Sequence, residues 1–281
     1  MNKKQLKKLK KQAKKKRPSG YIAQLTAAAE LFDHFPRIKY LINNVLEADR
    51  LLKRGLLPQP LPKLLLPDDI QDELFAAVNA QYAPHDPAGD RLWDRYSAAL
   101  PKLDQQLRNF RDYLEETYGM WSYTNTAFVR ALSDFLNGAP VLEIMAGSGY
   151  LSKGLRDLRP SQVIYTTDSQ AWAKESATGR HPVTTIEALD ALAAIKKYGD
   201  QVKVVILSWA PDKDENDYQI LHLLRQHYPD LTFVVIGERN GATNSARFWR
   251  EAKLSQPAEL AKANAALKSF DLIDEQVYLV K

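Results

Sequence analysis

The chain has 281 residues, of which 45% are apolar and 10% aromatic, so it can form one large domain or two modest ones. It contains no cysteine, which excludes disulfides, thiolate metal sites and cysteine nucleophiles. The net charge of +5 comes from one end, because residues 1–17 hold ten lysines and arginines and no acid, and the remainder has 29 basic against 34 acidic residues.

Residues 1–19 are predicted to be a basic, disordered tail, since such a run repels itself and cannot bury a core. Its lysines and arginines, from Lys3 to Arg17, are suited to neutralise phosphates, which makes RNA the expected partner. A solvated tail that only aids solubility is the alternative interpretation.

Residues 20–137 are predicted to be a helical N-terminal region. Apolar residues recur at the spacing of a helix with one buried face in three stretches, around residues 38–46, 103–114 and 128–136. Four prolines in residues 56–69 predict an extended connector between the first two stretches.

Residues 138–281 follow a different pattern, which begins after the helix-ending residues 137–140 (Asn-Gly-Ala-Pro). Short apolar runs at 141–146, 162–168, 183–188, 202–208 and 231–237 alternate with segments long enough for crossover helices. Residues 267–275 and 276–281 are expected to supply the last strands. The pattern predicts an α/β, Rossmann-like, doubly wound and mostly parallel seven-stranded sheet.

A glycine turn follows the first expected strand, in the sequence Glu-Ile-Met-Ala-Gly-Ser-Gly of residues 143–149. Glycine lets a ligand approach the backbone closely, here at Ala146, Gly147 and Gly149. Two acids strengthen this signal, because Glu143 lies at the end of the first strand and Asp168 ends the second, where a carboxylate can accept ribose hydroxyls.

These motifs resemble those of class I S-adenosylmethionine-dependent methyltransferases, over residues 121–281. The resemblance implies S-adenosylmethionine as the cofactor and assigns ribose binding to Asp168. It implies adenine binding at Asp190 and Ala191, with Glu187 as the alternative. It also implies that the segment 118–128 helps enclose the cofactor, with Tyr123 and Trp121 over its methionine portion.

Two positions depart from the family pattern. Met145 stands where the family has the first glycine of Gly-x-Gly-x-Gly, which the loop tolerates if the methionine points into the sheet. The sequence Ser-Trp-Ala-Pro at 208–211 only partly resembles the Asp/Asn-Pro-Pro-aromatic loop of amino-group methyltransferases, so adenine or glutamine methylation is not carried over to this chain.

Ser208, Trp209 and Glu238 are the candidate catalytic residues, and Ser208 is also a candidate cofactor contact. Trp209 is expected either to stack on a planar substrate, to touch the sulfonium, or simply to pack beneath the loop. Glu238 is expected to bind substrate, serve as base or cap a helix. Arg239, Asn240 and Asn244 are polar loop residues with similar alternatives, and no histidine–acid pair offers a general base.

Nicotinamide or flavin binding is the rival enzymatic interpretation, but Ser152 stands where a dinucleotide loop has glycine or alanine. A second alternative is a catalytically lapsed cofactor-fold module with an RNA-binding tail. The five histidines lack metal-ligand spacing, and no apolar run reaches the ~18 residues of a membrane span. We therefore expect a cytoplasmic enzyme without metal or membrane, whose substrate the sequence leaves open, with RNA or an RNA-associated protein as one candidate.

Overall fold

The structure is a computed structural model that describes residues 20–171 and 182–281. The predictions for the basic tail fall on residues outside this description. Backbone contacts divide the chain into two compact units. Of the described residues, unit 1 comprises 20–46 and 65–109, and unit 2 comprises 47–64, 110–171 and 182–281.

Unit 1 is helical. It contains α2 (Tyr21–Leu31), most of α3 (Pro36–Lys53), α4 (Ile70–Gln81) and α5 (Pro87–Arg108). Aromatic rings form the centre of its core: Tyr96 stacks on Phe32 at a centroid distance of 5.5 Å and meets Phe35 edge-on at 5.4 Å. Aromatic pairs of this geometry add to the stabilisation that comes from apolar burial.

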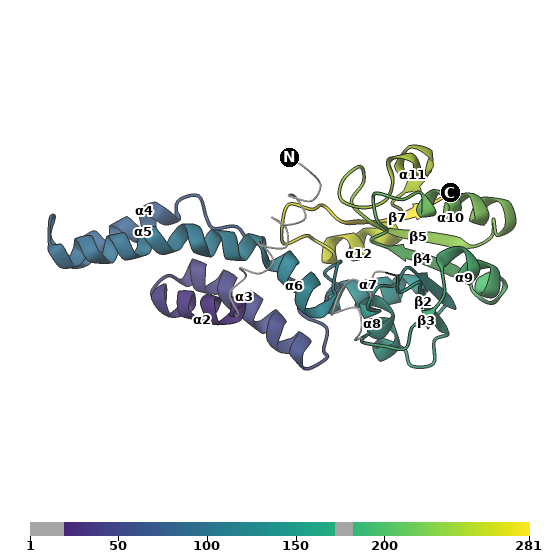
Figure 1. Cartoon of the computed structure of the whole chain (residues 1–281), viewed down its shortest axis with the longest axis horizontal. Coiled ribbons are helices and arrows are strands. Elements are labelled where there is room, and N and C mark those ends of the chain that lie inside the picture. Colours follow the sequence, from purple (N-terminus) through teal and green to yellow (C-terminus); the bar gives the residue numbers. More distant parts are fainter. Residues whose placement is uncertain (1–19, 172–181) are drawn as a thin grey trace, which may run out of the picture. The chain divides into compact units, whose positions relative to one another are not determined.

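Unit 2 is built on a seven-stranded sheet with the order β3-β2-β1-β4-β5-β7-β6 (Figure 1). Strands β1 to β5 pair in parallel, and β7 is antiparallel to both β5 and β6. The strands are β1 (Val141–Ile144), β2 (Ile164–Asp168), β3 (Glu187–Ala188), β4 (Val204–Ser208), β5 (Thr232–Gly237), β6 (Leu254–Ser255) and β7 (Gln276–Val280).

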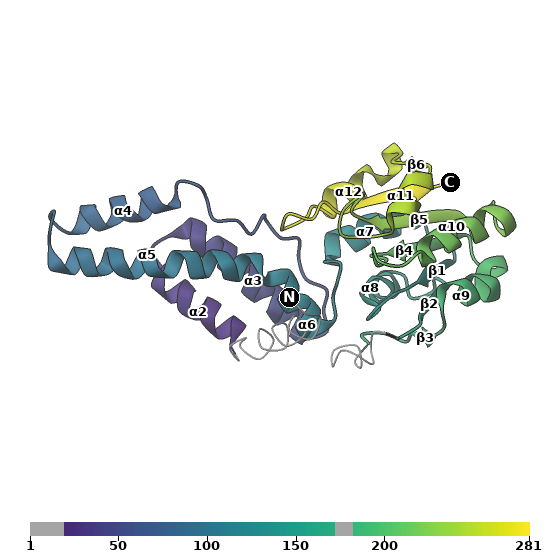
Figure 2. The same cartoon turned by 45° about the horizontal axis from the view of Figure 1, so that its top comes forward.

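Helices cover both faces of this sheet, so the predicted Rossmann-like, doubly wound fold is confirmed (Figure 2). The helices of unit 2 are α6 (Phe110–Tyr118), α7 (Thr126–Leu136), α8 (Tyr150–Leu158), α9 (Ala191–Tyr198), α10 (Asn216–His227), α11 (Ala246–Glu251) and α12 (Ala261–Ala266), with short 3₁₀ turns at Gly199–Gln201 and Ala258–Leu260.

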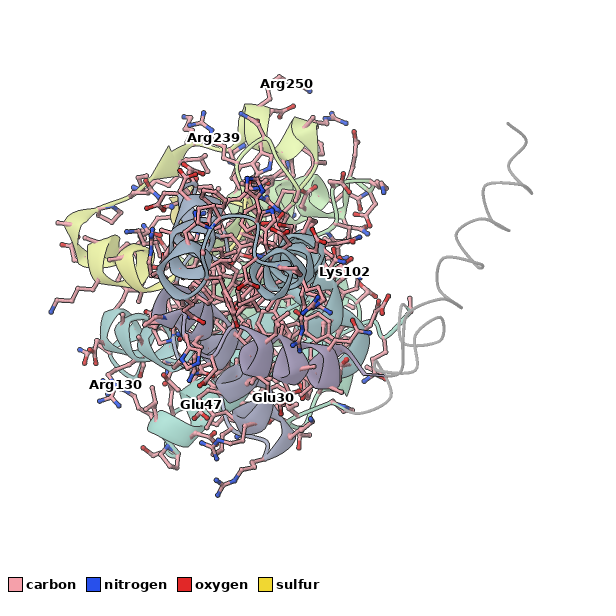
Figure 3. The ribbon with its side chains drawn as sticks, turned by 90° about the vertical axis from the view of Figure 1, so that its left-hand side faces the viewer. Glu30, Glu47, Lys102, Arg130, Arg239 and Arg250 are labelled. Atoms are coloured by element: carbon pink, nitrogen blue, oxygen red, sulfur yellow. The ribbon has the colours of Figure 1, made fainter. Side chains whose placement is uncertain are left out.

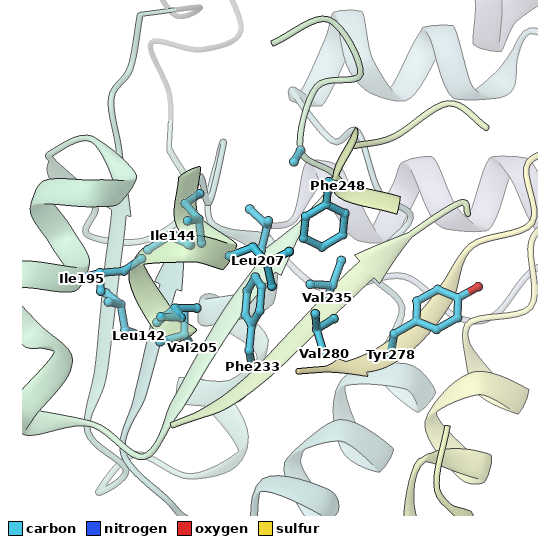
Figure 4. Close-up of a cluster of buried hydrophobic side chains, with 14 of the residues drawn as sticks. Leu142, Ile144, Ile195, Val205, Leu207, Phe233, Val235, Phe248, Tyr278 and Val280 are labelled. Carbon is cyan, nitrogen blue, oxygen red and sulfur yellow. The ribbon is translucent and has the colours of Figure 1, made fainter. Parts of the chain in front are cut away.

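The two faces follow from the alternation of side chains along each strand. Leu142, Val205 and Phe233 contribute to a cluster with α9, α10 and α11 on one face (Figure 4). Their neighbours Val141, Val204 and Val234 pack with α7, α8 and α12 on the other. Strands buried on both faces read as continuous apolar runs, which is why the sequence revealed them.

The unit boundaries differ from the predicted division at residue 137, because residues 47–64 and 110–137 group with the sheet. Helix α7 packs its apolar stripe on the sheet, and residues of the proline connector bond to the chain near β7. One such bond joins the Leu64 amide to the Phe270 carbonyl at 2.7 Å. The connector is extended, as the four prolines predict.

Two strands differ from expectation. The apolar run at 183–188 forms a strand only at Glu187–Ala188. The sixth strand is Leu254–Ser255, and residues 267–275 form no strand. In that segment the Asp271 carboxylate accepts hydrogen bonds from Ser269 and from the Ile273 amide, which holds the backbone in a compact loop.

Charged side chains of unit 2 that lie away from the sheet, such as Arg130, Arg239 and Arg250, point outward from the ribbon (Figure 3). Within residues 20–171 and 182–281, no helix is long and apolar enough to cross a membrane. Those same residues contain no cluster of three or more histidines and acids that could hold a metal ion.

Candidate functional site

The loop after β1 turns sharply on left-handed backbone. Met145, Gly147 and Gly149 have φ angles of 54°, 57° and 81°. A side chain at Gly149 would also collide with Thr184, whose Cγ2 lies 2.7 Å from the position of a Cβ. Glycine is therefore required at Gly149 for two reasons and at Gly147 for its backbone angle alone.

Met145 has a left-handed backbone conformation, which explains why the family has glycine at the matching position. A residue with a Cβ adopts this conformation at a cost of roughly 1–2 kcal/mol. Its side chain packs against the apolar cluster between the sheet and helices α9–α11. This is the condition under which the sequence predicted that the loop tolerates methionine. Burial of the thioether offsets the backbone strain.

Glu143 is 2% exposed and lies on the sheet face that α8 covers. Its Oε2 accepts a hydrogen bond from the Ser152 amide at 3.0 Å and another from the Ser152 hydroxyl. Burial raises the pKa of Glu143 to about 7 against the opposing effect of these bonds. Glu143 thus anchors the first turns of α8 to β1 beside the glycine loop.

Asp168 ends β2 next to the same loop. Its Oδ2 accepts from the Gly147 amide at 2.9 Å, and its Oδ1 accepts from the Gln170 amide at 2.6 Å. Asp168 is therefore hydrogen-bonded directly to the glycine turn, although it lies 21 residues after Gly147 in the sequence.

The residues expected near adenine have local roles. Asp190 caps the N-terminus of α9, because its side chain accepts from the Ala193 amide at 2.9 Å. Ala191 is the first residue of that helix. The alternative residue, Glu187, binds Lys197 at 2.6 Å and the Tyr198 hydroxyl at 2.5 Å.

Trp209 follows β4 with a φ angle of 56°, and its amide donates to the Ile236 carbonyl at 2.9 Å. The guanidinium of Arg111 lies over its ring, 4.7 Å from the centroid. The indole Nε1–H is buried and has no hydrogen-bond partner among the described residues. Of the three expected roles, stacking on a planar substrate is therefore limited to the ring face opposite Arg111.

Arg111 of α6 was not a predicted site residue. Its side chain is 8% exposed, and it binds Asp271 through Nε at 2.6 Å and Glu275 through Nη1 at 2.9 Å. Nη1 also donates to the Trp121 carbonyl at 2.8 Å. The sequence did carry a signal, because Arg111 falls within the apolar pattern of residues 103–114, three residues before Leu114 of the same helix.

Glu238 uses its carboxylate to hold two loops. Oε2 accepts from the Ala242 amide at 2.7 Å, and Oε1 accepts from the Asp274 amide at 2.9 Å. Arg239 and Asn240 are exposed, whereas Asn244 is buried with both amide atoms lacking a hydrogen-bond partner in the described chain.

Tyr123 is 5% exposed and donates its hydroxyl proton to the Gln59 carbonyl at 2.8 Å. Its ring meets Phe270 edge-on at 5.3 Å. Trp121, by contrast, is 45% exposed. Trp121 is therefore the accessible one of these two aromatic residues.

A small pocket, with a cavity volume of about 70 Å³, opens at the carboxyl ends of β1 and β4. Strand order reverses between these two strands, which is where ligands bind in open α/β sheets. The lining comprises residues 119–122, Thr124, Glu143, residues 145–148, residues 150–151 and residues 208–209.

The pocket brings together six predicted residues: Trp121, Glu143, Ala146, Gly147, Ser208 and Trp209. The described lining does not include Tyr123, Gly149, Asp168, Asp190, Ala191 or Glu238. It adds Ser148, whose buried hydroxyl has no partner within the described residues, and Ser122.

Comparison with solved structures finds methyltransferases. The plantazolicin methyltransferase BpumL in complex with SAH is 13% identical with a TM-score of 0.35, covering 76% of this chain and 98% of that one. Human N-acetylserotonin methyltransferase in complex with SAM is 14% identical with a TM-score of 0.34, covering 75% and 66%. RosA from Streptomyces davawensis, an N,N-8-amino-8-demethyl-D-riboflavin dimethyltransferase, is 13% identical with a TM-score of 0.33, covering 89% and 71%.

No family model matches the chain, and no curated protein matches its sequence. The strand order defines the fold independently of these comparisons. Five parallel strands extend in two directions from β1, and the antiparallel β7 lies between β5 and β6. The chain therefore has a Rossmann-like, doubly wound fold.

Proposed function

We propose that this chain is an S-adenosylmethionine-dependent methyltransferase whose cofactor lies in the pocket at the ends of β1 and β4. One observation carries the proposal: two polar atoms, Ser148 Oγ and Trp209 Nε1, are buried in the lining without a partner among the described residues. An unsatisfied buried donor costs about 1–3 kcal/mol, so such atoms point to a polar ligand.

The residues present fit the cofactor. The loop of residues 145–148 exposes backbone to the pocket, and Ser148 and Trp209 offer it hydrogen-bond donors. In this proposal Glu143 and Gly147 hold the cofactor from β1, Asp168 receives the ribose hydroxyls and Asp190 with Ala191 meets the adenine. Receiving the ribose requires Asp168 to share or exchange its bonds to the Gly147 and Gln170 amides.

The bound cofactor would supply a methyl group on a positively charged sulfur, with a good leaving group already in place. What remains for the protein is to orient the acceptor, exclude water and receive a proton. Ser208 and Trp209 form the wall of the pocket at the end of β4 and are the proposed contacts to the methyl acceptor. Glu238 is a less suitable base, since both its oxygens accept backbone amides.

The binding test is calorimetric titration with S-adenosylhomocysteine (SAH). Replacing Asp168 by alanine should weaken binding by about 1–3 kcal/mol, and Ser148→Ala by about 0.5–1.5 kcal/mol, the usual range for losing a hydrogen bond. Asp230→Ala is the matched control, because Asp230 is an exposed aspartate at the opposite edge of the sheet, before β5. Failure of the unmodified protein to bind SAH, or equal affinity for all variants, would refute the proposal.

We propose RNA, or a protein bound to it, as the acceptor, on the basis of the ten lysines and arginines in residues 1–17. Each phosphate that these residues neutralise adds to the salt dependence of binding. Deleting residues 1–17 should therefore flatten the dependence of RNA affinity on salt concentration, and an unchanged slope would refute the tail as the contact. SAH binding without methyl release to RNA, protein or small-molecule pools would instead favour a lapsed cofactor-fold module.

A further inference from the structure

A buried carboxylate lies behind the wall of the pocket. Glu275, which immediately precedes β7, is 2% exposed. Its Oε1 accepts from Arg111 Nη1 at 2.9 Å, and its Oε2 accepts from the Ser122 hydroxyl at 3.3 Å. Ser122 belongs to the pocket lining. One oxygen of Glu275 is thus fixed by a cation, and the other is hydrogen-bonded to a hydroxyl at the pocket.

The position of Arg111 shows at which end of the pocket this hydroxyl lies. The same guanidinium that binds Glu275 stands 4.7 Å from the Trp209 ring centroid and binds the carbonyl of Trp121, the neighbour of Ser122. Trp209 follows directly after β4. Ser122 and Glu275 are therefore on the side of the pocket where the proposed function has the methyl acceptor.

The charged groups that face Glu275 within the described chain are Arg111 from α6 and Asp271 from the connection between α12 and β7. Burial raises the pKa of Glu275 to about 7 and outweighs the attraction of Arg111, while the negative Asp271 raises it further. A group with this pKa exists with and without its proton near neutral pH, as proton transfer at that pH requires.

We propose that Ser122 receives the proton lost by the methyl acceptor and passes its own proton to Glu275. This inference rests on the proposed methyltransferase function and names its acceptor class: a molecule with a hydrogen on the atom to be methylated, such as a hydroxyl or an amine. It also supplies the general base that no histidine–acid pair in the sequence provided.

In the methyl transfer, the lone pair of the acceptor atom forms a bond to the methyl carbon, and the carbon–sulfur bond breaks with its electron pair remaining on sulfur. The acceptor's proton moves to Ser122 Oγ as the Ser122 proton moves to Glu275 Oε2. Glu275 then returns the proton to solvent through Ser122 when the product leaves. Ser122 is the residue that touches the acceptor, and Glu275 acts through it.

The test compares the affinities of two cofactor analogues and needs no acceptor. SAH has no group at the methyl position. Sinefungin has a carbon bearing an amino group in place of the sulfonium and its methyl, so its ammonium occupies the position from which the methyl leaves. The ratio of the two affinities, measured by calorimetry from pH 5.5 to 8.5, therefore reports on what faces that position.

In the unmodified protein the preference for sinefungin over SAH should rise by roughly three- to tenfold as pH increases through 7, because an ionised Glu275 strengthens the hydrogen bond that Ser122 accepts from the ammonium. Glu275→Gln and Ser122→Ala should each abolish this rise, and the ratio of the two affinities cancels any loss of binding that SAH and sinefungin share. Circular dichroism and the SAH affinity itself show whether each variant is folded.

Asp271→Asn is the matched control, because it removes the other acidic partner of Arg111 and leaves Ser122 and Glu275 in place. It should keep the rise but move it to lower pH, since Asp271 raises the pKa of Glu275. A preference that does not change with pH in the unmodified protein, or the same rise in Glu275→Gln, would overturn the relay alone. Loss of SAH binding by the unmodified protein would overturn the proposed function with it.

Discussion

The two units of the chain differ in what they bury. The buried side chains of unit 1 are apolar. Its ion pairs, such as those of Arg37 with Asp69 and Glu73, are at least partly exposed to solvent. Every buried polar or charged residue of the described chain belongs to unit 2, with Arg111, Glu143 and Glu275 among them.

This difference indicates where the chemistry of the chain lies. Burying a polar group destabilises a fold unless the group is paired, and burying a charge does so more strongly. Unit 1 has only a packed apolar core. Unit 2 buries polar groups around its pocket, and two polar atoms there, Ser148 Oγ and Trp209 Nε1, have no hydrogen-bond partner among the described residues.

The largest expected effect is on stability, when one buried and one exposed arginine are each replaced by methionine. Arg111→Met should lower the free energy of unfolding by about 3–5 kcal/mol, because it leaves the buried Glu275 and the largely buried Asp271 without their cation. Arg37→Met should change it little, because its partners are solvated. Denaturant unfolding measures the free energy of unfolding of both variants. Similar losses in the two would contradict the proposed difference between the units.

A second comparison concerns two glycines in the loop after β1, within unit 2. Gly149→Ala combines a left-handed φ with a collision at Thr184, whereas Gly147→Ala has the left-handed φ with open space around the new Cβ. Each should cost roughly 1–2 kcal/mol for its backbone angle, with at least ~1 kcal/mol more at Gly149. Thermal unfolding measures both variants; a larger loss at Gly147 would show that the loop is packed differently.

A third effect is on the pH dependence of stability. Glu275 has a folded-state pKa of about 7, above the ordinary value of about 4, so the folded state holds more protons between these values. Its contribution to stability is fully present below pH 4 and is lost as pH rises through 7. Unfolding at pH 5 and pH 8 should show this loss, and Glu275→Gln should reduce it.

The control for this last prediction is Glu73→Gln in unit 1, whose carboxylate is partly exposed beside Arg37. That variant should leave the fall in stability between pH 5 and pH 8 unchanged. An equal reduction in both variants would mean that the effect does not arise from the buried carboxylate.

The sheet was largely predictable from sequence, because parallel strands covered on both faces read as apolar runs with glycine and acids at their ends. The proximity of Glu143, Gly147 and Asp168 around one turn was predictable because strand, glycine turn, helix and next strand follow each other in sequence. The short β6 at Leu254–Ser255 could not, since two residues of ladder leave no periodic signal.

The rest of the site depends on contacts between distant parts of the chain. Arg111 and Glu275 are 164 residues apart, and neither belongs to a motif. Tyr123 and Trp121 are equally aromatic in sequence, and only packing decides that Tyr123 is buried and Trp121 reaches the pocket. The unit boundary could not be predicted either. The apolar stripe of α7 is typical of any helix with one buried face, so the sequence does not indicate that this face packs on the sheet.

The reversed direction of β7 has a consequence for the order in which the molecule is completed. Because β7 is antiparallel to β5, its first residue pairs with Gly237 at the end of β5, so Glu275 arrives at the same edge as residues that terminate other strands. The ribosome synthesises this segment after the glycine turn and Arg111. The turn can therefore form before β7 docks, whereas Arg111 is paired with Glu275 and Asp271 only once that strand is in place.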